Sequence, residues 1–200
     1  MSSPPPSIFD RPLMRTRNDV SLSFFAFLFS EVVQYSMTQT TPQVHLEDRL
    51  HEMGVRVGYR ILDLLVARDM GSSGQHRNVA AFGKKETRAL GMLSFVSQVC
   101  WRALFGKPGD LLKSQDKPNE YMINDKNLVL NKYISVPKDM GQVNCGAYAA
   151  GIVEGILHSA EFPCEVSAHT VDDAPGVQST TLLIRLAPEV MQRERKLAAG

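Results

Sequence analysis

The spacing of apolar residues predicts three helices in the first half of the chain. The first helix begins after Asn18, with Asn18, Asp19 or Ser21 as its N-cap. The second begins near Thr41-Pro42, and the third extends from about Glu86 to Phe105. Apolar stripes at helical spacing predict the inward sides, which are Leu46, Leu50, Met53, Val57, Ile61 and Leu64 in the second helix, and Leu90, Leu93, Val96, Val99, Cys100, Ala103 and Leu104 in the third.

The first helix is apolar on two opposite sides. At about 100° per residue, one side groups Leu22, Phe25, Ala26, Phe29 and Val33, and the other groups Phe24, Phe27, Leu28 and Tyr35, with Glu31 among them. An unpaired carboxylate is costly in a domain interior and fits the rim of an interface. We therefore expect Leu22, Phe25, Phe29 and Val33 to face the chain's own core. The side with Phe24, Phe27, Leu28, Glu31 and Tyr35 is predicted to face another chain.

The second half of the chain changes to a strand-like pattern. Short β-rich runs predict strands over 121–123 and 128–136, and two more over 164–171 and 179–186, the last two joined by a turn over 172–176. A helix lined with small residues lies between the two pairs, and a charged tail covers 189–196. Helices combined with a small antiparallel sheet predict an α+β domain.

Small residues recur at helical spacing in two places. Ala147, Gly151 and Gly155 fall four residues apart and stack on one side of their helix. A glycine inside a helix costs roughly 1 kcal/mol relative to alanine, so another element is expected to pack unusually close, and we expect it to be the sheet. Gly54 and Gly58 in the second helix predict a close helix crossing in the same way.

The composition is that of one moderately sized globular domain. Residues 18–200 are predicted to form it, after a disordered proline-rich tail over 1–17, and the Gly- and Ser-rich stretch at about 71–85 predicts a flexible loop. The formal net charge of +1 gives no electrostatic signature of nucleic-acid binding. Three widely spaced cysteines favour reduced thiols in the cytosol.

A basic segment followed by an apolar run imitates a secretory signal peptide near the N-terminus. Arg11, Arg15 and Arg17 precede the run from Val20 to Phe29. Polar residues interrupt or close this run, no small-x-small cleavage site follows it cleanly, and it is too short to span a bilayer as a helix. We therefore interpret it as part of the first helix.

Motifs for enzymatic chemistry are weak. The stretch Gly106-Lys107-Pro108-Gly109 lacks the spacing and the hydroxyl residue of a phosphate-binding loop, so no GTPase activity is expected. Cys164 and His169 would point to opposite faces of a strand without a second ligand pair, so neither a metal nor a covalent cofactor is expected.

Cys145 is the one candidate nucleophile, because a thiol at a helix N-terminus can have a lowered pKa. His158 or His169, with Asp172, could supply the base. The alternative is a small buried cysteine that begins a tightly packed helix.

Four segments resemble a known family. Residues 51–63, HEMGVRVGYRILD, resemble the M-G-x-x-x-G segment of the small α+β subunits of TRAPP, the trafficking protein particle complex. SLSFFAFLFSEVVQY at 21–35, CWRALFGKPGD at 100–110 and YISVPKDMGQVNCGAYAAGIVEGIL at 133–157 resemble one particular subunit type of this complex. The resemblance covers roughly residues 18 to 197.

The resemblance implies a four-stranded antiparallel sheet covered by helices. It also implies a non-catalytic subunit of a rod-like assembly that tethers vesicles and promotes nucleotide exchange on a Rab GTPase. In this family, exchange is a property of the assembled subunits. Such a subunit pairs with TRAPP subunit 3 and acts in ER-to-Golgi and Golgi traffic. It is cytoplasmic and associates peripherally, through the complex, with cis-Golgi and endoplasmic reticulum membranes.

One departure from the family pattern concerns lipid. In subunit 3 and some other relatives, a cysteine in the loop after the second helix accepts an acyl chain into an internal channel, but residues 71–83 contain no cysteine here. Acylation at that position is therefore not expected. Two other functions remain open from the residues, namely a small-molecule or lipid-binding module with a pocket between helices and sheet, and a cysteine hydrolase.

Overall fold

The computed structural model describes residues 21–40, 45–134, 143–174 and 177–199 except for residues 71–86, and side chains are not described at 66–70, 172–178 and 199. The predicted disordered tail over 1–17 and the predicted loop at 71–85 lie outside the described residues. The helices are α1 (Leu22–Thr38), α2 (Leu46–Met70), α3 (Ala89–Phe95), α4 (Trp101–Phe105), α5 (Val129–Lys132), α6 (Gly146–Ser159) and α7 (Pro188–Ala199). A π-helical turn, η3 (Val96–Cys100), joins α3 to α4.

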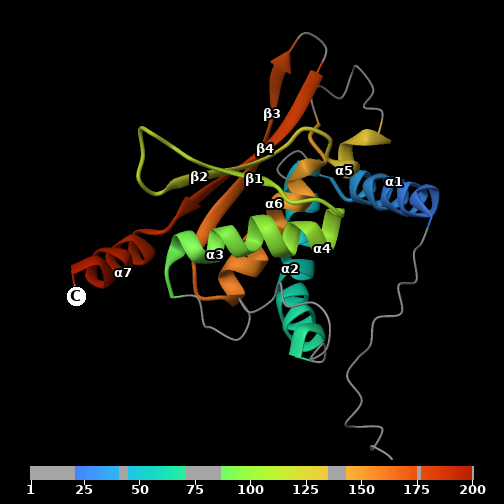
Figure 1. The fold of residues 1–200 in the computed structure, drawn as a ribbon. Helices are drawn as coiled ribbons and strands as arrows, with labels where there is room; N and C mark the ends of the chain where they lie inside the picture. The colour runs from blue at the N-terminus through green and yellow to red at the C-terminus, as the bar shows by residue number, and fades with distance from the viewer. Residues whose placement is uncertain (1–20, 41–44, 71–86, 135–142, 175–176, 200) are drawn as a thin grey trace, which may run out of the picture.

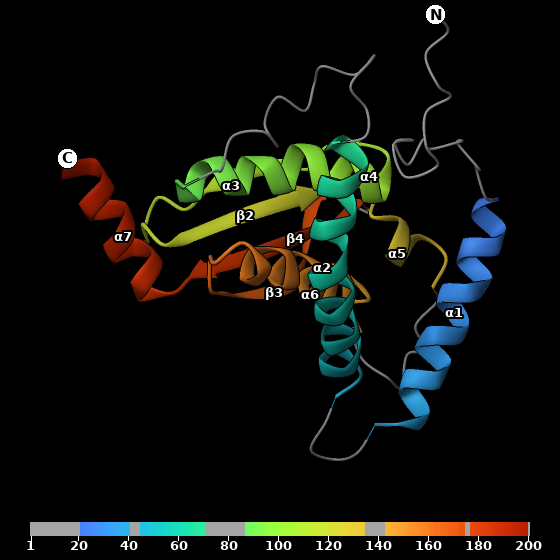
Figure 2. The same ribbon diagram turned by 90° about the horizontal axis from the view of Figure 1, so that it is seen from below.

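Four strands form one antiparallel sheet, as the sequence and the family resemblance predicted. They are β1 (Asp110–Lys113), β2 (Glu120–Asp125), β3 (Cys164–Ala174) and β4 (Val177–Leu186), in the spatial order β1-β2-β4-β3 (Figure 1). Helix α6 packs on β3 and β4, while α3 and α4 run along β2 (Figure 2). The core lies between these helices and the sheet, and its fully buried side chains include Trp101, Ile123, Ile156, Leu182 and Ile184.

Ser21 is the N-cap of α1, one of the three residues that the sequence offered. Its hydroxyl oxygen accepts a hydrogen bond from the backbone N–H of Phe24 at 3.2 Å. This bond satisfies one of the N–H groups that the first turn of a helix leaves without an intrahelical partner. The start predicted for α2 at Thr41-Pro42 lies outside the described residues.

The third helix is not the uniform α-helix that the apolar stripe predicted. Leu93, Val96 and Cys100 are buried as expected, but the π turn at 96–100 widens the helix and rotates the residues after it. Trp101 therefore becomes fully buried, whereas Ala103 is exposed. Leu90 is 58% exposed, so its predicted inward position is wrong.

Two segments of the predicted sheet need correction. The run 128–136 was expected to be a strand, but Val129–Lys132 forms the short helix α5, and the missing strand is β1. A short apolar run cannot be assigned to strand or helix by periodicity alone. The charged tail at 189–196 belongs to helix α7.

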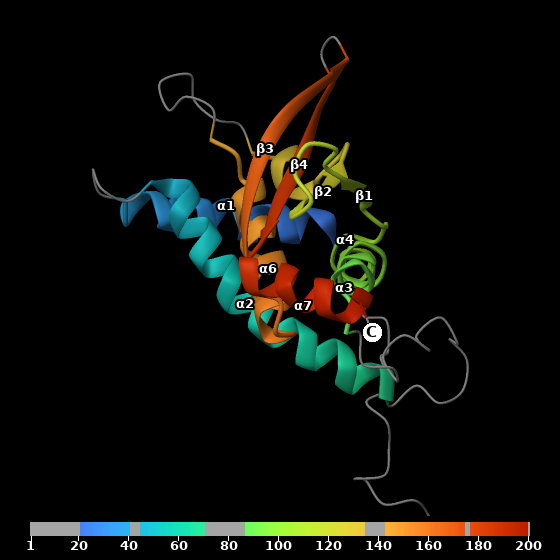
Figure 3. The ribbon, with the colours of Figure 1, turned by 90° about the vertical axis from the view of Figure 1, so that its left-hand side faces the viewer.

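Gly151 and Gly155 of α6 face α2 rather than the sheet, which corrects the expected packing. A Cβ atom at Gly151 would overlap the backbone carbonyl of His51, and one at Gly54 would overlap that of Tyr148. Gly58 and Gly155 approach each other at the next turn, where a Cβ on Gly58 would lie 2.9 Å from the Gly155 Cα. The close helix crossing predicted from Gly54 and Gly58 is therefore confirmed, and Figure 3 shows α2 running diagonally past α6.

Candidate functional site

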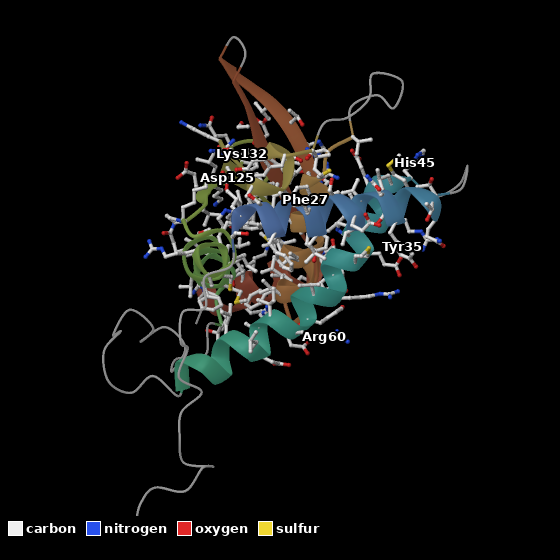
Figure 4. All side chains as sticks on the ribbon, turned by 90° about the vertical axis from the view of Figure 1, so that its right-hand side faces the viewer. Phe27, Tyr35, His45, Arg60, Asp125 and Lys132 are labelled. Atoms are coloured by element: carbon white, nitrogen blue, oxygen red, sulfur yellow. The ribbon has the colours of Figure 1, made fainter. Side chains whose placement is uncertain are left out.

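The outer side of α1 is the largest group of exposed apolar side chains that the structure places on one element. Phe24, Phe27, Leu28 and Tyr35 are 60%, 77%, 55% and 62% exposed, and Glu31 is exposed among them. Figure 4 shows α1 lying across the surface, with Phe27 and Tyr35 on it. Exposed apolar groups gathered in this way, and rimmed by polar residues, mark interaction sites on soluble proteins.

The inner side of α1 attaches the helix to the domain. Phe29 is only 6% exposed, stacks on Phe25 at a ring distance of 6.0 Å and contacts Tyr148 of α6 at 5.6 Å. Val33 is also buried, as predicted. Leu22 was expected on this side but is 48% exposed, at the first position of α1. Apart from Leu22, the residues predicted on the inner side of α1 are less exposed than those predicted on its outer side.

A polar cavity of about 310 Å³ lies where α5, the start of α6 and the β3–β4 hairpin meet. Its lining includes Lys126, Lys132, Asn131, Asn144, Thr170 and Thr180. Sequence reasoning missed this site, because Asn144, Thr170 and Thr180 are far from the segment 126–132 in the sequence and only the fold gathers them. The lining is unlike the apolar surface that an acyl chain would need.

Hydrogen bonds between side chains hold the floor of this cavity. The Asn131 amide donates to Thr180 Oγ1 at 2.8 Å and to Asn144 Oδ1 at 3.1 Å. The Asn144 amide in turn donates to Thr170 Oγ1 at 3.2 Å. Asn144 is fixed from below by Glu47 of α2, whose carboxylate accepts the Asn144 backbone N–H at 2.7 Å. The floor is therefore a rigid, pre-formed polar surface.

Cys145 sits beside this cavity as the N-cap of α6, but the structure does not support its predicted reactivity. Burial raises the pKa of its thiol to about 11, and the negative charge of Glu47 contributes to the increase. The predicted lowering of the pKa by the helix N-terminus is therefore outweighed. The interpretation as a small buried cysteine at the start of a tightly packed helix fits instead.

The histidines proposed as a base are engaged elsewhere. His158 Nε2 lies 2.9 Å from the Cys164 carbonyl oxygen at the start of β3, and His169 Nε2 lies 2.8 Å from Ser167 Oγ. The Asp172 side chain lies outside the described ones. Among the described residues, no group of three or more His, Cys, Asp or Glu side chains is arranged to hold a metal ion. No described helix is both long and apolar enough to cross a membrane.

Comparison with known proteins identifies the class of protein. The family model described as "Transport protein particle (TRAPP) component" matches residues 25–187. The chain therefore belongs to the TRAPP component family, as the sequence segments indicated.

The relatives narrow this to one subunit type. The chain is 45% identical to trafficking protein particle complex subunit 5 of Dictyostelium discoideum, over 96% of this chain and 99% of that protein. It is 39% identical to human subunit 5, over 96% and 93%. Subunit 31 of Saccharomyces cerevisiae is 26% identical, over 95% of this chain and 84% of that protein. The subunit type that residues 21–35, 100–110 and 133–157 resembled is subunit 5.

A solved structure shows the same fold at low sequence identity. A crystal structure of TRAPP complex subunit 3 from Naegleria fowleri, covalently bound to palmitic acid, aligns with a TM-score of 0.64 and 18% identity. The alignment covers 83% of this chain and 95% of that one. The chain is thus a TRAPP complex component with the family fold, and proteins named in this way are subunits of an assembly.

Proposed function

We propose that this chain is a non-catalytic structural subunit of TRAPP whose α1 outer face binds TRAPP subunit 3. The exposed row of Phe24, Phe27, Leu28 and Tyr35 is the observation that carries the proposal. Burying one such side chain is worth about 1.5–3 kcal/mol, so this face favours association with a partner. Glu31 is exposed at the same face, as expected for the polar rim of an interface.

Family membership supports the cellular role that we propose. In the proposal, the assembled complex promotes nucleotide exchange on a Rab GTPase and tethers vesicles in ER-to-Golgi and Golgi traffic. The chain contributes to exchange only through assembly. Its location is cytoplasmic, with peripheral association at cis-Golgi and endoplasmic reticulum membranes through the complex.

Two matched double variants test the binding face. Phe24→Asp with Leu28→Asp changes the exposed side of α1, and should keep the chain folded but abolish its complex with subunit 3. Phe25→Asp with Phe29→Asp changes the inner side, and should unfold the chain, because Phe29 is buried against Tyr148. Circular dichroism measures folding, and co-purification with subunit 3 from the same organism measures binding.

Two results of this co-purification would contradict the proposal. If the Phe24/Leu28 variant still co-purifies with subunit 3 in normal yield, the outer face of α1 is not the interface. If the wild-type chain itself does not bind subunit 3, the choice of partner is wrong.

A further inference from the structure

We propose that the polar cavity beside α5 receives an acidic side chain of the protein that covers α1. This inference rests on the proposed function, because it assumes that a partner subunit covers the α1 face. It adds the chemistry by which that partner is recognised next to the apolar row.

The cavity has a positive mouth. Lys126 and Lys132 line it and are both exposed, and none of the described residues in its lining is an Asp or Glu. Within the described part of the chain, neither lysine forms an ion pair, and Lys132 only approaches the ring of Tyr133, at 5.5 Å from Nζ to the ring centroid. Two lysines at one opening favour an incoming carboxylate.

The two nearby carboxylates among the described side chains are already engaged. Asp125 precedes Lys126, but its oxygens accept hydrogen bonds from Trp101 Nε1 at 3.1 Å, from the Asn127 backbone N–H at 2.9 Å and from Lys107 Nζ. Its side chain is only 2% exposed. Glu47, on the other side of the cavity wall, accepts the Asn144 backbone N–H. Neither group is therefore available to neutralise Lys126 and Lys132.

The floor offers hydrogen-bond donors to an anion. Thr170 Oγ1 and Thr180 Oγ1 each accept an amide N–H, so the O–H of each hydroxyl is still available to donate. Thr180 is only 5% exposed, and its position is fixed by Asn131. A carboxylate entering between the lysines would meet these hydroxyls, and hydrogen bonds to an ionised acceptor are stronger than neutral ones.

The cavity lies near the proposed binding face. Figures 1, 2 and 4 show α5 alongside α1, and Figure 4 places Lys132 on the same side of the molecule as Phe27. A partner lying over the apolar row therefore passes the mouth of the cavity. Half-buried Ile134 and Val143 also line the cavity and suit the aliphatic stem of a glutamate or aspartate.

The test uses the full chain and TRAPP subunit 3 of the same organism. Lys126→Met with Lys132→Met removes both charges but keeps the side-chain stems. We expect at least tenfold weaker binding at about 50 mM salt, and a smaller difference at about 500 mM, because salt screens the attraction. Lys196→Met on α7, at the other end of the molecule (Figure 1), is the matched control and should leave affinity unchanged.

A zero-length carbodiimide cross-linker identifies the occupant directly. It joins a lysine amine to a touching carboxylate, so mass spectrometry of the complex should find Lys126 or Lys132 joined to an Asp or Glu of subunit 3. Unchanged affinity of the double variant, together with no such cross-link, would overturn the inference while leaving the proposed function intact. Failure of the wild-type chain to bind subunit 3 would instead overturn the proposed function.

A third measurement separates a protein carboxylate from a free anion. Inorganic phosphate at constant ionic strength is titrated into the free chain while the backbone amide signals of Asn131 and Thr180 are followed by NMR. Shifts at these residues combined with normal subunit 3 binding by the lysine variant would make the cavity a small-anion site. That outcome contradicts the proposal.

Discussion

The α2–α6 crossing and helix α1 use an apolar helix face in opposite ways. At the crossing, Gly54 and Gly151 bring the two backbones into contact, so that the faces of α2 and α6 bury each other within one chain. Helix α1 instead attaches through one side, around Phe29, and exposes bulky residues such as Phe27 on the other. The face of α2 at the crossing is buried when the chain folds, whereas the outer face of α1 stays exposed and can bind another protein.

The polar groups at the two regions reinforce this contrast. At the crossing, His51 Nε2 lies 3.3 Å from Glu154 Oε2, and Glu154 also accepts the backbone N–H of Val166 in β3 at 2.9 Å. Charged groups there are paired across elements of the same chain. On the outer side of α1, Glu31 forms no ion pair among the described residues. Its exposure to solvent fits a surface whose partner is another protein.

The largest expected effect is at the crossing. Gly54→Ala with Gly151→Ala should destabilise the chain by up to about 4 kcal/mol, because overpacking at the upper end of about 1–3 kcal/mol per site outweighs the gain of about 1 kcal/mol in helix propensity at each. The added methyl groups would meet backbone carbonyls, which cannot rotate away. Urea unfolding followed by circular dichroism measures the change.

A glycine without close neighbours serves as the control for this variant. Gly106→Ala places a methyl where nothing lies within 4 Å, at a φ of +79°. It should cost only about 1–2 kcal/mol, the penalty of a left-handed backbone for an L-residue. A double variant at the crossing that is as stable as Gly106→Ala would show that α2 and α6 can separate at little cost.

Truncating the inner side of α1 should have the next largest effect. Phe29→Ala is expected to cost about 3 kcal/mol, because it removes a buried ring that contacts both Phe25 and Tyr148. The free energy of unfolding from urea titration gives the value. A loss below about 1 kcal/mol would mean that α1 is held by something other than this cluster.

The His51–Glu154 pair predicts a smaller effect that depends on pH. The paired carboxylate of Glu154 raises the pKa of His51 above its ordinary value. Burial opposes ionisation of Glu154, but the pairing with His51 and the hydrogen bond from the Val166 N–H outweigh it and lower the Glu154 pKa. A raised histidine pKa stabilises the fold below about pH 6.5, and this stabilisation is lost as the pH rises through the folded-state pKa.

His51→Gln should therefore destabilise the chain most near pH 5.5–6, by about 1–2 kcal/mol, and less at pH 8. The lowered pKa of Glu154 adds stability above about pH 4.5, which is lost on further acidification. Urea unfolding of both proteins at the two pH values measures the difference. His169→Gln, at an exposed position of β3, is the control. An equal loss at both pH values would mean that His51 acts as a neutral side chain.

The smallest expected effect is at the outer side of α1. Phe27→Ala should change the stability of the isolated chain by no more than about 0.5 kcal/mol, because the side chain is 77% exposed. The same change should weaken the complex with subunit 3. This combination of results would distinguish the outer side of α1 from its inner side, where truncation lowers the stability of the free chain. Thermal unfolding of the free chain and affinity by calorimetry provide the two values. A large loss of stability in the free chain would place Phe27 in the chain's own core.

The sequence by itself predicted those features that depend on local spacing. The period of apolar residues predicted the three helices of the first half and the two long strands, because one buried face imposes a repeat of 3.6 or 2 residues. The same spacing separated Phe29 from Phe27 on α1, and glycines four residues apart predicted a close approach. The family resemblance added the class of protein.

Only the tertiary structure decided which elements meet. The spacing of Gly151 and Gly155 predicts a close neighbour but does not say whether it is the sheet or α2, since either could lie against a smooth helix face. Val129–Lys132, within the run at 128–136, forms α5 rather than a strand, and β1 pairs with β2 instead. The polar cavity joins Lys126 and Asn144 with Thr180, which are distant in sequence, so no local pattern could reveal it.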